Sequence, residues 1–484
     1  MRHLLIIIAA LSLSFTLPPS KIERKYYNEL YRPQFHFTPE KNGMSEPNGL
    51  VYYDGEYHLF YQYRPDTTAT GNMQWGHAVS KDLIRWEHLA GFIIHDDNAS
   101  ENGHCTPYSG CAIVDEKNLT GLQEGSEKTL LIYYTSWECG QRLAYSNDKG
   151  RSWKKYEKNP LMPYDKDGAS GPYVFFHQSS GKWVMALYRR PEGVEAKQGI
   201  SFYNSDDLLH WQFQSHIEGF NSSAELFQLP LDGKASNPKW VLSGGSDVYL
   251  VGNFDGKAFT PETKNRKLDL GKNFHAARTW SNAPDGKLIQ IAWMRGGKYP
   301  GMPFDGQMSF PCQLSLRTVK SGPVLCRKPV EGLSVLYDKD LKKKGKNIIP
   351  GLKGNLISGI DGEALHIKAI FDPKSSDGFG FIVRNGKKSS GTIIKYELAK
   401  KILDCLGRQA LIEPVNGKLQ LEILVDRSSI EIFANDGEIV LSSCFNPDAG
   451  CDELVLWTQG GELFVDNLEI YQLNSAWGEK TASK

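Results

Sequence analysis

Cysteine and histidine are the residue types that most often hold metals or carry redox chemistry, and their spacing here predicts neither. The chain has eight cysteines, and no two of them form a C-x-x-C pair. Its twelve histidines show no spacing that would gather several of them around one metal ion. Cys105 and Cys111, like Cys444 and Cys451, are close enough in sequence to bridge short loops, with ordinary buried thiols as the alternative. We therefore expect no metal and no cofactor.

The balance of charge narrows the class of partner. Lys and Arg together number 56, as do Asp and Glu, in a chain of 484 residues. The basic excess that binding of a phosphate backbone requires is lacking, which argues against nucleic acid as a partner. A neutral polar ligand such as a sugar is compatible with this balance. No pattern in the sequence specifies an oligomeric state.

The first 20 residues resemble a signal peptide. Arg2 supplies a positive charge, an apolar run covers residues 4–13, and small residues follow that could be cleaved. This run is too short for a membrane-spanning helix, and no later segment is apolar enough to be one. A buried N-terminal helix is the alternative. We expect the mature protein to be secreted or periplasmic, without a membrane span.

Short strands with frequent turns dominate the rest of the chain. Runs rich in aromatic and β-branched residues, such as residues 57–63 and 183–188, are separated by turn dipeptides such as Asp54-Gly55. No long stretch has the period of a helix. The fold class predicted from this pattern is all-β.

A repeated phrase predicts the architecture that would position any site. A serine, an aspartate two residues later and a closing tryptophan recur in residues 80–86, 146–153 and 205–211. The copies are roughly 60 residues apart, which suits one four-stranded blade each. About five such units would fill residues 30–330 as a five-bladed β-propeller. We expect the three tryptophans to pack between blades.

The pattern changes after residue 330. Residues 339–346 are a basic stretch, which we interpret as a solvated connector or face. Alternating segments such as residues 419–425 and 430–433 then predict strands, and Asn435-Asp436-Gly437 predicts a hairpin turn. We assign residues 340–475 to a second domain, a C-terminal β-sandwich.

Several ordered phrases resemble glycoside hydrolase family 32, which includes invertases, levanases and inulinases. Residues 42–49 (N-G-M-S-E-P-N-G) are similar to the family's W-M-N-D-P-N-G, and residues 108–111 (Y-S-G-C) to its F-S-G-S. Residues 425–433 (V-D-R-S-S-I-E-I-F) are typical of its C-terminal sandwich. The resemblance covers nearly all of the mature chain. It implies a propeller followed by a sandwich, and cleavage of fructosyl linkages with retention.

The resemblance also implies which positions would be catalytic, and all three are replaced. The family's nucleophilic Asp is Glu46 here, its transition-state-stabilising Asp of the R-D-P motif is Gly171, and its acid/base Glu of the E-C motif is Ser222. Retention requires two carboxyl groups about 5–5.5 Å apart. Glu46 keeps the charge on a longer side chain, but serine cannot act as the general acid, whose loss costs roughly 10²–10⁴-fold.

Neighbouring residues complete the predicted site. Asp165 and Asp167 precede the R-D-P position and could replace a lost carboxyl only if their loop brings one within reach. Glu225 follows Ser222 at an odd offset, which on a strand points to the opposite side. The resemblance assigns substrate binding to Asn48, Gln62, Trp75, Ser109, Ser170 and Arg278. Arg278 stands where the family often has the Gln of A-A-Q-T, and a buried arginine would fill a sugar site or favour an anion.

Three functions are compatible with these residues. The first is a pseudoenzyme that recognises fructan or sucrose-type carbohydrate without cleaving it. The second is an active β-fructosidase with Glu46 as nucleophile and a relocated acid. The third is an interaction protein without a sugar ligand. Because function depends on the site and not on the fold, the replaced carboxylates favour the first.

Overall fold

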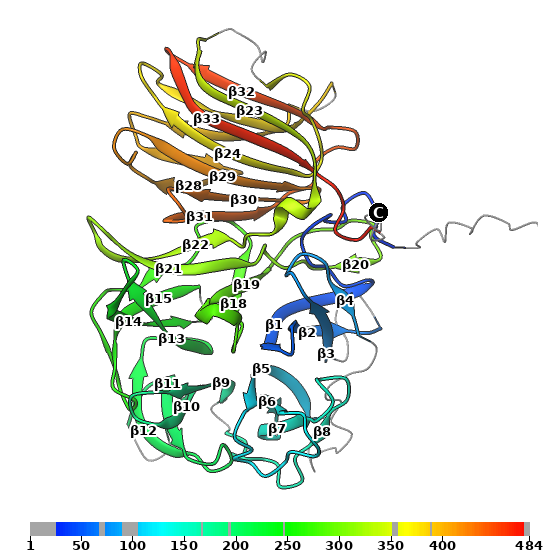
Figure 1. The fold of residues 1–484 in the computed structure, drawn as a ribbon, viewed down its shortest axis with the longest axis vertical. Coiled ribbons are helices and arrows are strands. Elements are labelled where there is room, and N and C mark those ends of the chain that lie inside the picture. Colours follow the sequence, from blue (N-terminus) through cyan, green and yellow to red (C-terminus); the bar gives the residue numbers. More distant parts are fainter. Residues whose placement is uncertain are drawn as a thin grey trace, which may run out of the picture.

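A computed structural model describes residues 26–66, 73–89, 105–165, 168–191, 195–244, 247–350, 357–387 and 390–478. The predicted signal peptide and Asp167 lie outside these residues. The architecture is all-β, with a β-propeller followed by a C-terminal β-sandwich (Figure 1). The described helices are two short 3-10 turns, η1 (Pro284–Gly286) and η2 (Leu333–Leu336). Among the described residues, no helix has the length and apolar character needed to cross a membrane.

Five antiparallel blades surround the propeller axis, and the first strand of each is the innermost (Figure 1). Blade 1 contains β1 (Asn42–Tyr53), β2 (Glu56–Arg64), β3 (Gln74–Ser80) and β4 (Glu87–His88), with β20 (Phe304–Asp305) parallel to β1. Blade 2 contains β5 (Thr106–Asp115), β6 (Thr129–Trp137), β7 (Gly140–Ser146) and β8 (Lys154–Lys155). Blade 3 contains β9 (Ser170–His177), β10 (Lys182–Arg189), β11 (Gly199–Ser205) and β12 (Gln212–Glu218).

The last two blades are joined through one parallel pairing, between Leu231 of β13 and Leu316 of β21. Blade 4 contains β13 (Ala224–Leu231), β14 (Lys234–Gly244), β15 (Val248–Phe254), β16 (Phe259–Pro261) and β17 (Arg266–Lys267). Blade 5 contains β18 (Phe274–Thr279), β19 (Ile289–Met294), β21 (Cys312–Val319) and β22 (Gly322–Pro329).

The repeated sequence phrase forms the same turn in three blades. In the first copy, Ser80 Oγ accepts a hydrogen bond from the backbone N–H of Leu83. Asp82 Oδ1 accepts hydrogen bonds from the backbone N–H groups of Ile84 and Arg85, in the manner of an Asx turn. Leu83, Lys149 and Leu208 occupy the same place in the three copies and all have left-handed backbone, with φ of 64°, 59° and 66°.

The tryptophan that closes each turn packs onto the preceding blade, which confirms the predicted packing role. Trp153 lies 5.7 Å from Phe60 of blade 1, and Trp211 lies 6.0 Å from Tyr133 of blade 2, between ring centroids. Trp86 closes the circle by stacking on Trp280 after β18, at 6.2 Å. These contacts pack blades 1, 2 and 3 each against the blade before it.

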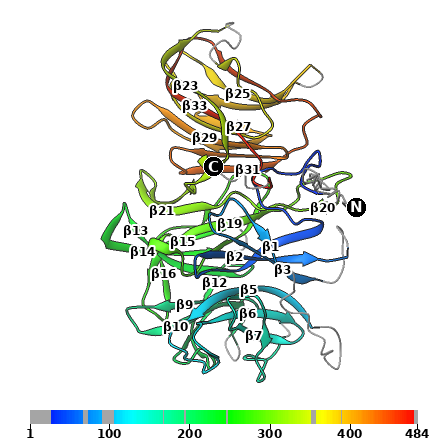
Figure 2. The ribbon, with the colours of Figure 1, turned by 45° about the vertical axis from the view of Figure 1, so that its right-hand side comes forward.

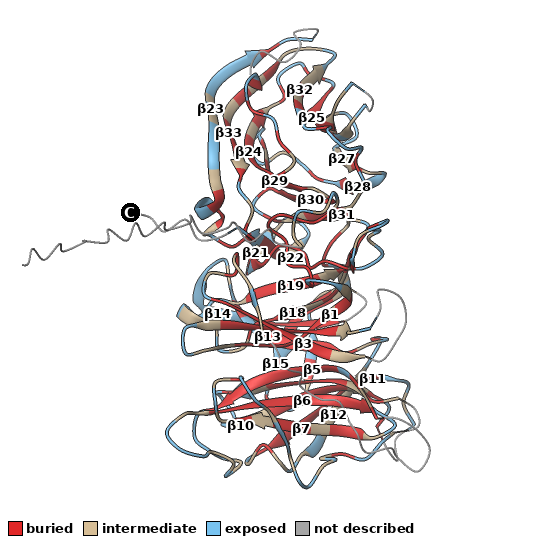
Figure 3. Cartoon of the chain, turned by 90° about the vertical axis from the view of Figure 1, so that its right-hand side faces the viewer, coloured by how far each residue is buried: buried red, intermediate tan, exposed pale blue. Residues whose placement is uncertain are grey.

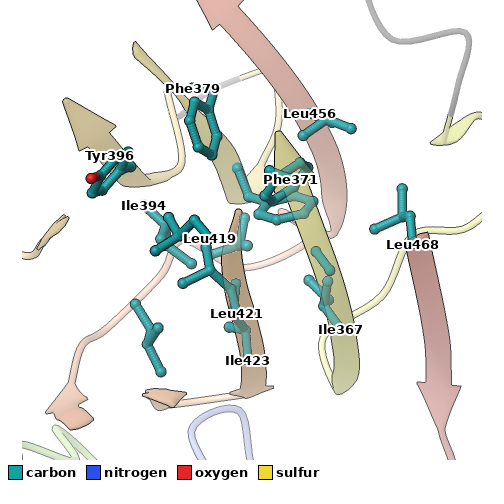
Figure 4. Close-up of a cluster of buried hydrophobic side chains, with 14 of the residues drawn as sticks. Ile367, Phe371, Phe379, Ile394, Tyr396, Leu419, Leu421, Ile423, Leu456 and Leu468 are labelled. Atoms are coloured by element: carbon teal, nitrogen blue, oxygen red, sulfur yellow. The ribbon is translucent and has the colours of Figure 1, made fainter. Parts of the chain in front are cut away.

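The sandwich contains two sheets whose facing side chains form one apolar core (Figure 4). The larger sheet, in order, is β23 (Tyr337–Ile348), β33 (Leu463–Leu473), β24 (Leu365–Asp372), β29 (Leu419–Asp426), β30 (Ser429–Ala434) and β31 (Ile439–Cys444). The smaller sheet is β28 (Arg408–Leu411), β27 (Ile402–Cys405), β26 (Thr392–Glu397), β25 (Gly378–Asn385) and β32 (Glu453–Gln459). The predicted hairpin turn joins β30 to β31, with Asn435 and Asp436 both in the left-handed region.

The basic stretch at residues 339–346 is part of edge strand β23 and pairs with β33, so the connector interpretation was wrong. Its side chains are largely exposed, as expected of a solvated face (Figure 3). Lysines on an edge strand oppose pairing with a second molecule.

The sandwich lies directly on the propeller (Figure 2). A buried cluster of charges, which we call the clamp, holds the two together. His36 is fully buried and donates to Asp426 Oδ2 and Glu431 Oε2, each at 2.8 Å. Burial alone would lower the pKa of His36, but the two carboxylates outweigh it and raise that pKa to about 9. Asp426 also accepts from the backbone N–H groups of Gln34 and Phe35. The V-D-R-S-S-I-E-I-F phrase thus supplies both carboxylates of the clamp.

One disulfide is present among the described cysteines, and it differs from both pairs that closeness in sequence allowed. Cys105 bonds to Cys139, with 5.6 Å between their Cα atoms. The pairing of β5 with β6 places Thr106 opposite Trp137, which brings these two cysteines together at the strand ends. Cys111, Cys444 and Cys451 are free thiols, so neither short-loop bridge forms and the alternative of unbridged thiols holds for them.

Candidate active site

Most of the predicted site residues lie on, or directly beside, the inner strands of the propeller, and Trp75 lies farther out on β3. Several of them, together with Ser223, form two contact groups, which we call together the axial site. The first group contains Glu46 of β1, Gln62 of β2 and Ser109 of β5. The second contains Gly171 of β9, Ser223 before β13 and Arg278 of β18.

Glu46 is half-buried and its carboxylate is held in one orientation. Ser109 donates to Glu46 Oε2 at 3.0 Å, and Gln62 Nε2 lies 3.5 Å from the same oxygen. Ser45 donates to Gln62 Oε1 at 2.9 Å, which fixes the amide. The pairing of β1 with β2 shifts register between Met44 and Pro47, so Glu46 sits in a bulge. Bulges re-aim side chains in this way near functional sites.

Asn48 and Trp75, both predicted to bind substrate, are fully buried behind this group. Asn48 Oδ1 accepts from the Gly110 N–H at 3.1 Å, and its Nδ2 donates to the Glu46 carbonyl at 3.2 Å. Trp75 Nε1 donates to the Tyr108 carbonyl at 2.7 Å. Their polar atoms therefore fix the part of β5 that carries Ser109.

The second group leaves no room for a side chain at Gly171, where the family resemblance predicted a carboxylate position. Gly171 has a φ of +62°, and a Cβ added there would lie 2.2 Å from Ser223 Cβ and 3.4 Å from Arg278 Nη2. Arg278 is buried and its Nη2 donates to Ser223 Oγ at 2.6 Å. The Gly171 N–H donates to Thr135 Oγ1 at 2.9 Å, which anchors the strand from the other side. Sequence reasoning missed Ser223 and Thr135, because both act through contacts between blades.

Ser170 and Ser222 flank this group and are half-buried. Ser170 begins β9 opposite Tyr188, and Ser222 lies just before β13. Each brings a hydroxyl to its position and no carboxyl. These hydroxyls can exchange hydrogen bonds with a sugar but cannot supply an acid near neutral pH.

Two other carboxylates near these strands have partners of their own. Glu225 is buried, accepts from the backbone N–H and hydroxyl of Thr279, and lies 4.0 Å from Arg278 Nη1. Burial raises the pKa of Glu225 to about 7, although Arg278 and Thr279 oppose the rise. Asp165 pairs with Arg189 of β10 at 3.1 Å. Glu225 thus joins β13 to β18, and Asp165 joins the loop before β9 to β10.

Cavities lie elsewhere on the molecule. One cavity of about 440 Å³ lies between blade 1 and the C-terminal segment, with Trp86 and Trp477 in its lining. A second, of about 580 Å³, lies between the propeller and the sandwich beside Arg317 and Asp436. Neither is lined by Glu46, Gly171, Ser222 or Arg278. Among the described residues, no group of three or more His, Cys, Asp and Glu side chains is arranged to hold a metal ion.

Comparison with known proteins places this fold and site in one class. The model of the glycosyl hydrolases family 32 N-terminal domain matches residues 36–329, and the family's C-terminal model matches residues 335–472. The chain therefore belongs to glycoside hydrolase family 32. Among curated relatives, the levanase of Bacillus subtilis (strain 168) is 38% identical over 98% of this chain and 75% of its own length. The levanase of Bacillus sp. (strain L7) is 32% identical over 95% of this chain and 54% of its own length.

Solved structures agree with this assignment. The exo-inulinase of Aspergillus awamori superposes with a TM-score of 0.83 at 27% identity, covering 93% of this chain and all of that one. The beta-fructofuranosidase of Schwanniomyces occidentalis, solved in complex with fructosyl-erythritol, superposes with a TM-score of 0.80 at 25% identity, covering 92% of this chain and 98% of its own.

Proposed function

We propose that this family 32 member binds the terminal unit of a fructan or sucrose-type carbohydrate at the axial site and does not hydrolyse it. The observation that carries the proposal is the Gly171–Ser223–Arg278 group, in which Ser223 occupies the space that a side chain at residue 171 would need. A retaining mechanism needs two carboxyl groups about 5–5.5 Å apart, one attacking and one protonating. Only Glu46 remains at the three family positions, so neither the acid nor the stabilising carboxylate is supplied there.

Retained sugar binding is supported by the Glu46 group. Ser109 and Gln62 hold the Glu46 carboxylate in place before any ligand arrives, and such preorganisation lowers the entropic cost of binding. A carboxylate with a neighbouring hydroxyl can accept and donate hydrogen bonds to the adjacent hydroxyls of a sugar. The matched levanases and the fructosyl-erythritol complex indicate fructosyl units as the ligand class.

The alternative of an active β-fructosidase rests on one observation. Glu225 has a pKa of about 7, the value that suits a general acid at neutral pH. Its carboxylate, however, is buried and engaged by Thr279, which favours a structural role. Release of fructose that the Glu225→Gln variant abolishes would establish this alternative.

Replacing Glu46 by alanine is expected to weaken sugar binding about tenfold to a hundredfold, because a hydrogen bond to a charged group contributes about 1.5–3 kcal/mol. Titration calorimetry with sucrose and short levan oligosaccharides measures the change. Glu116→Ala is the matched control, since it removes an exposed carboxylate just beyond the end of β5. Equal affinity of the two variants, with both folded, would rule out Glu46 as a sugar ligand.

Export of the protein is part of the proposal. Residues 1–20 have the composition of a signal peptide, and the Cys105–Cys139 disulfide is typical of an oxidising compartment. A matched relative from Aspergillus niger is an extracellular exo-inulinase. N-terminal sequencing of the protein recovered from culture medium tests both the export and the cleavage position.

A further inference from the structure

A polar cavity of about 360 Å³ lies at the outer edge of blade 3. It is lined by Asn204 of β11, by Gln212 and Gln214 of β12, and by Lys257 from the turn between β15 and β16 of blade 4. We call this cavity the blade 3–4 pocket. Its volume is in the range of sites that hold small ligands.

The blade 3–4 pocket is separate from the axial site. Strand β9 begins at Ser170, beside the axial site, and ends at His177, after which the chain turns back at Lys182, a residue of the pocket lining. Because a strand rises about 3.3 Å per residue, this end of the blade lies roughly 20 Å from Ser170. Strand β12 is also the outermost strand of the blade (Figure 1). One sugar unit therefore cannot occupy both places.

Asn204 brings an unused hydrogen-bond acceptor to the pocket. The residue is only 9% exposed, and its Oδ1 has no hydrogen-bond partner among the residues that the structure describes. Phe202 lies two residues earlier on the same side of β11 and packs against Phe254 of blade 4, with 5.2 Å between ring centroids. Asn204 therefore faces blade 4, as Lys257 of the lining requires. A buried acceptor without a partner lowers the stability of the fold.

The fold itself does not require an asparagine at this place. The residue just before the serine of the repeated turn is Val79 in blade 1, Tyr145 in blade 2 and Asn204 in blade 3. Val79 is buried, and the serine hydroxyl accepts the same backbone hydrogen bond in blade 1 as in blade 3. Because an apolar side chain serves the same backbone, the amide of Asn204 is best explained by a ligand that donates a hydrogen bond to it.

The chemistry of the lining indicates a neutral, hydroxylated ligand. Lys182 pairs with Asp206 at 2.7 Å. His210 pairs with Asp207 at 2.6 Å. These charges are thus balanced within the lining, which leaves the three amides and Lys257 to meet a ligand. Amides both donate and accept hydrogen bonds, as do the hydroxyl groups of a sugar.

We propose that the blade 3–4 pocket is a second carbohydrate-binding site, which holds one neutral sugar unit through the amides of Asn204, Gln212 and Gln214. A sugar hydroxyl donates to Asn204 Oδ1 and supplies its missing partner. Two separate sites on one chain bind a long polysaccharide more tightly than either site alone. The inference goes beyond the proposed function and does not rest on it, because no residue of the pocket belongs to the axial site.

Titration calorimetry with sucrose tests the pocket in the Glu46→Ala protein, where axial binding is weakened. We expect this protein to retain a saturable heat, and we expect Asn204→Val, added to it, to weaken that binding at least tenfold. Gln212→Ala should weaken it in the same way, and its side chain is exposed, so the fold should not be affected. Gln409→Ala is the matched control, because it removes an exposed amide on β28 of the sandwich.

Melting of the Asn204→Val variant without sugar tests the argument from burial. Valine occupies the equivalent place in blade 1, so the melting temperature is expected to be at least as high as that of the natural protein. A clearly lower melting temperature would show that Asn204 supports the fold, and would overturn its assignment to a ligand.

The outcomes separate this inference from the proposed function. Sucrose binding that survives Glu46→Ala and falls with Asn204→Val supports the pocket. A single binding event that disappears in Glu46→Ala keeps the proposed function and overturns the pocket. A single binding event that is insensitive to Glu46→Ala but is lost in Asn204→Val keeps the pocket and overturns the proposed axial binding.

Discussion

The Asp426→Ala variant is expected to be less stable than the natural protein by about 3–5 kcal/mol, because the substitution leaves the charged His36 buried without its first carboxylate. The backbone N–H groups of Gln34 and Phe35 lose their acceptor in the same change. The entropy of unfolding grows with chain length, so this loss lowers the melting temperature by only about 3–5 °C if the chain melts as one unit. Differential scanning calorimetry measures the change in melting temperature.

The control for this variant is Asp466→Ala, which breaks a surface ion pair with Lys418 on the same sandwich. Such a pair contributes about 0–1 kcal/mol, so its melting temperature should barely change. If the two variants have the same melting temperature at pH 6.5, the clamp does not stabilise the fold.

The pH dependence of melting gives a second readout of the clamp. The pKa of His36 is about 9 in the folded protein and 6.5 for an ordinary histidine. Its stabilisation is therefore fully present below pH 6.5 and is lost as the pH rises through 9. Asp426 and Glu431 have lowered pKa values, because His36 outweighs their burial, so their contribution is lost on acidification. The fall in melting temperature between pH 6.5 and 9 should shift to lower pH in the Asp426→Ala variant.

Introducing any side chain at Gly171 is expected to destabilise the protein by about 2–5 kcal/mol, from left-handed backbone and overpacking together. Gly171→Ala places a Cβ 2.2 Å from Ser223 Cβ. Gly168→Ala is the matched control, because Gly168 has a φ of +84° with nothing within 4 Å of its Cβ position. It should show the backbone cost alone, about 1–2 kcal/mol.

A double-mutant cycle isolates the contact. Gly171→Ala combined with Ser223→Gly removes the clashing Cβ and should recover about 1–3 kcal/mol relative to the sum of the single changes. Urea denaturation gives the free energy of unfolding of the natural protein, the two single variants and the double variant. If Gly171→Ala lowers the free energy of unfolding by no more than Gly168→Ala does, then residue 171 and Ser223 are not in the close contact described. A functional consequence follows: restoring an aspartate at residue 171 requires Ser223 to change as well.

Much of the fold was predictable because its signals are local. The Ser-x-Asp turns are closed by residues only a few positions apart, and their tryptophans could be assigned to packing from sequence. The disulfide pairing could not be predicted, for the opposite reason. Cys105 and Cys139 are 34 residues apart and meet only through the register of β5 with β6, whereas Cys111 is nearer in sequence.

The contacts of the candidate site could not be predicted from sequence. Matching of phrases predicted Glu46, Gly171 and Ser222 as site positions, but which neighbours contact them depends on how the blades meet. Arg278 reaches Ser223 across 55 residues of sequence, and no local pattern specifies that bond.

Sugar binding without hydrolysis is tested most directly by measuring binding and cleavage in the same sample. The purified mature protein is titrated with levan oligosaccharides in a calorimeter, and the same sample is then assayed for free fructose over hours. We predict a saturable heat of binding with no fructose above the background of a Glu46→Ala sample. Fructose release that scales with protein concentration and disappears in Glu46→Ala would show a working hydrolase and contradict the account.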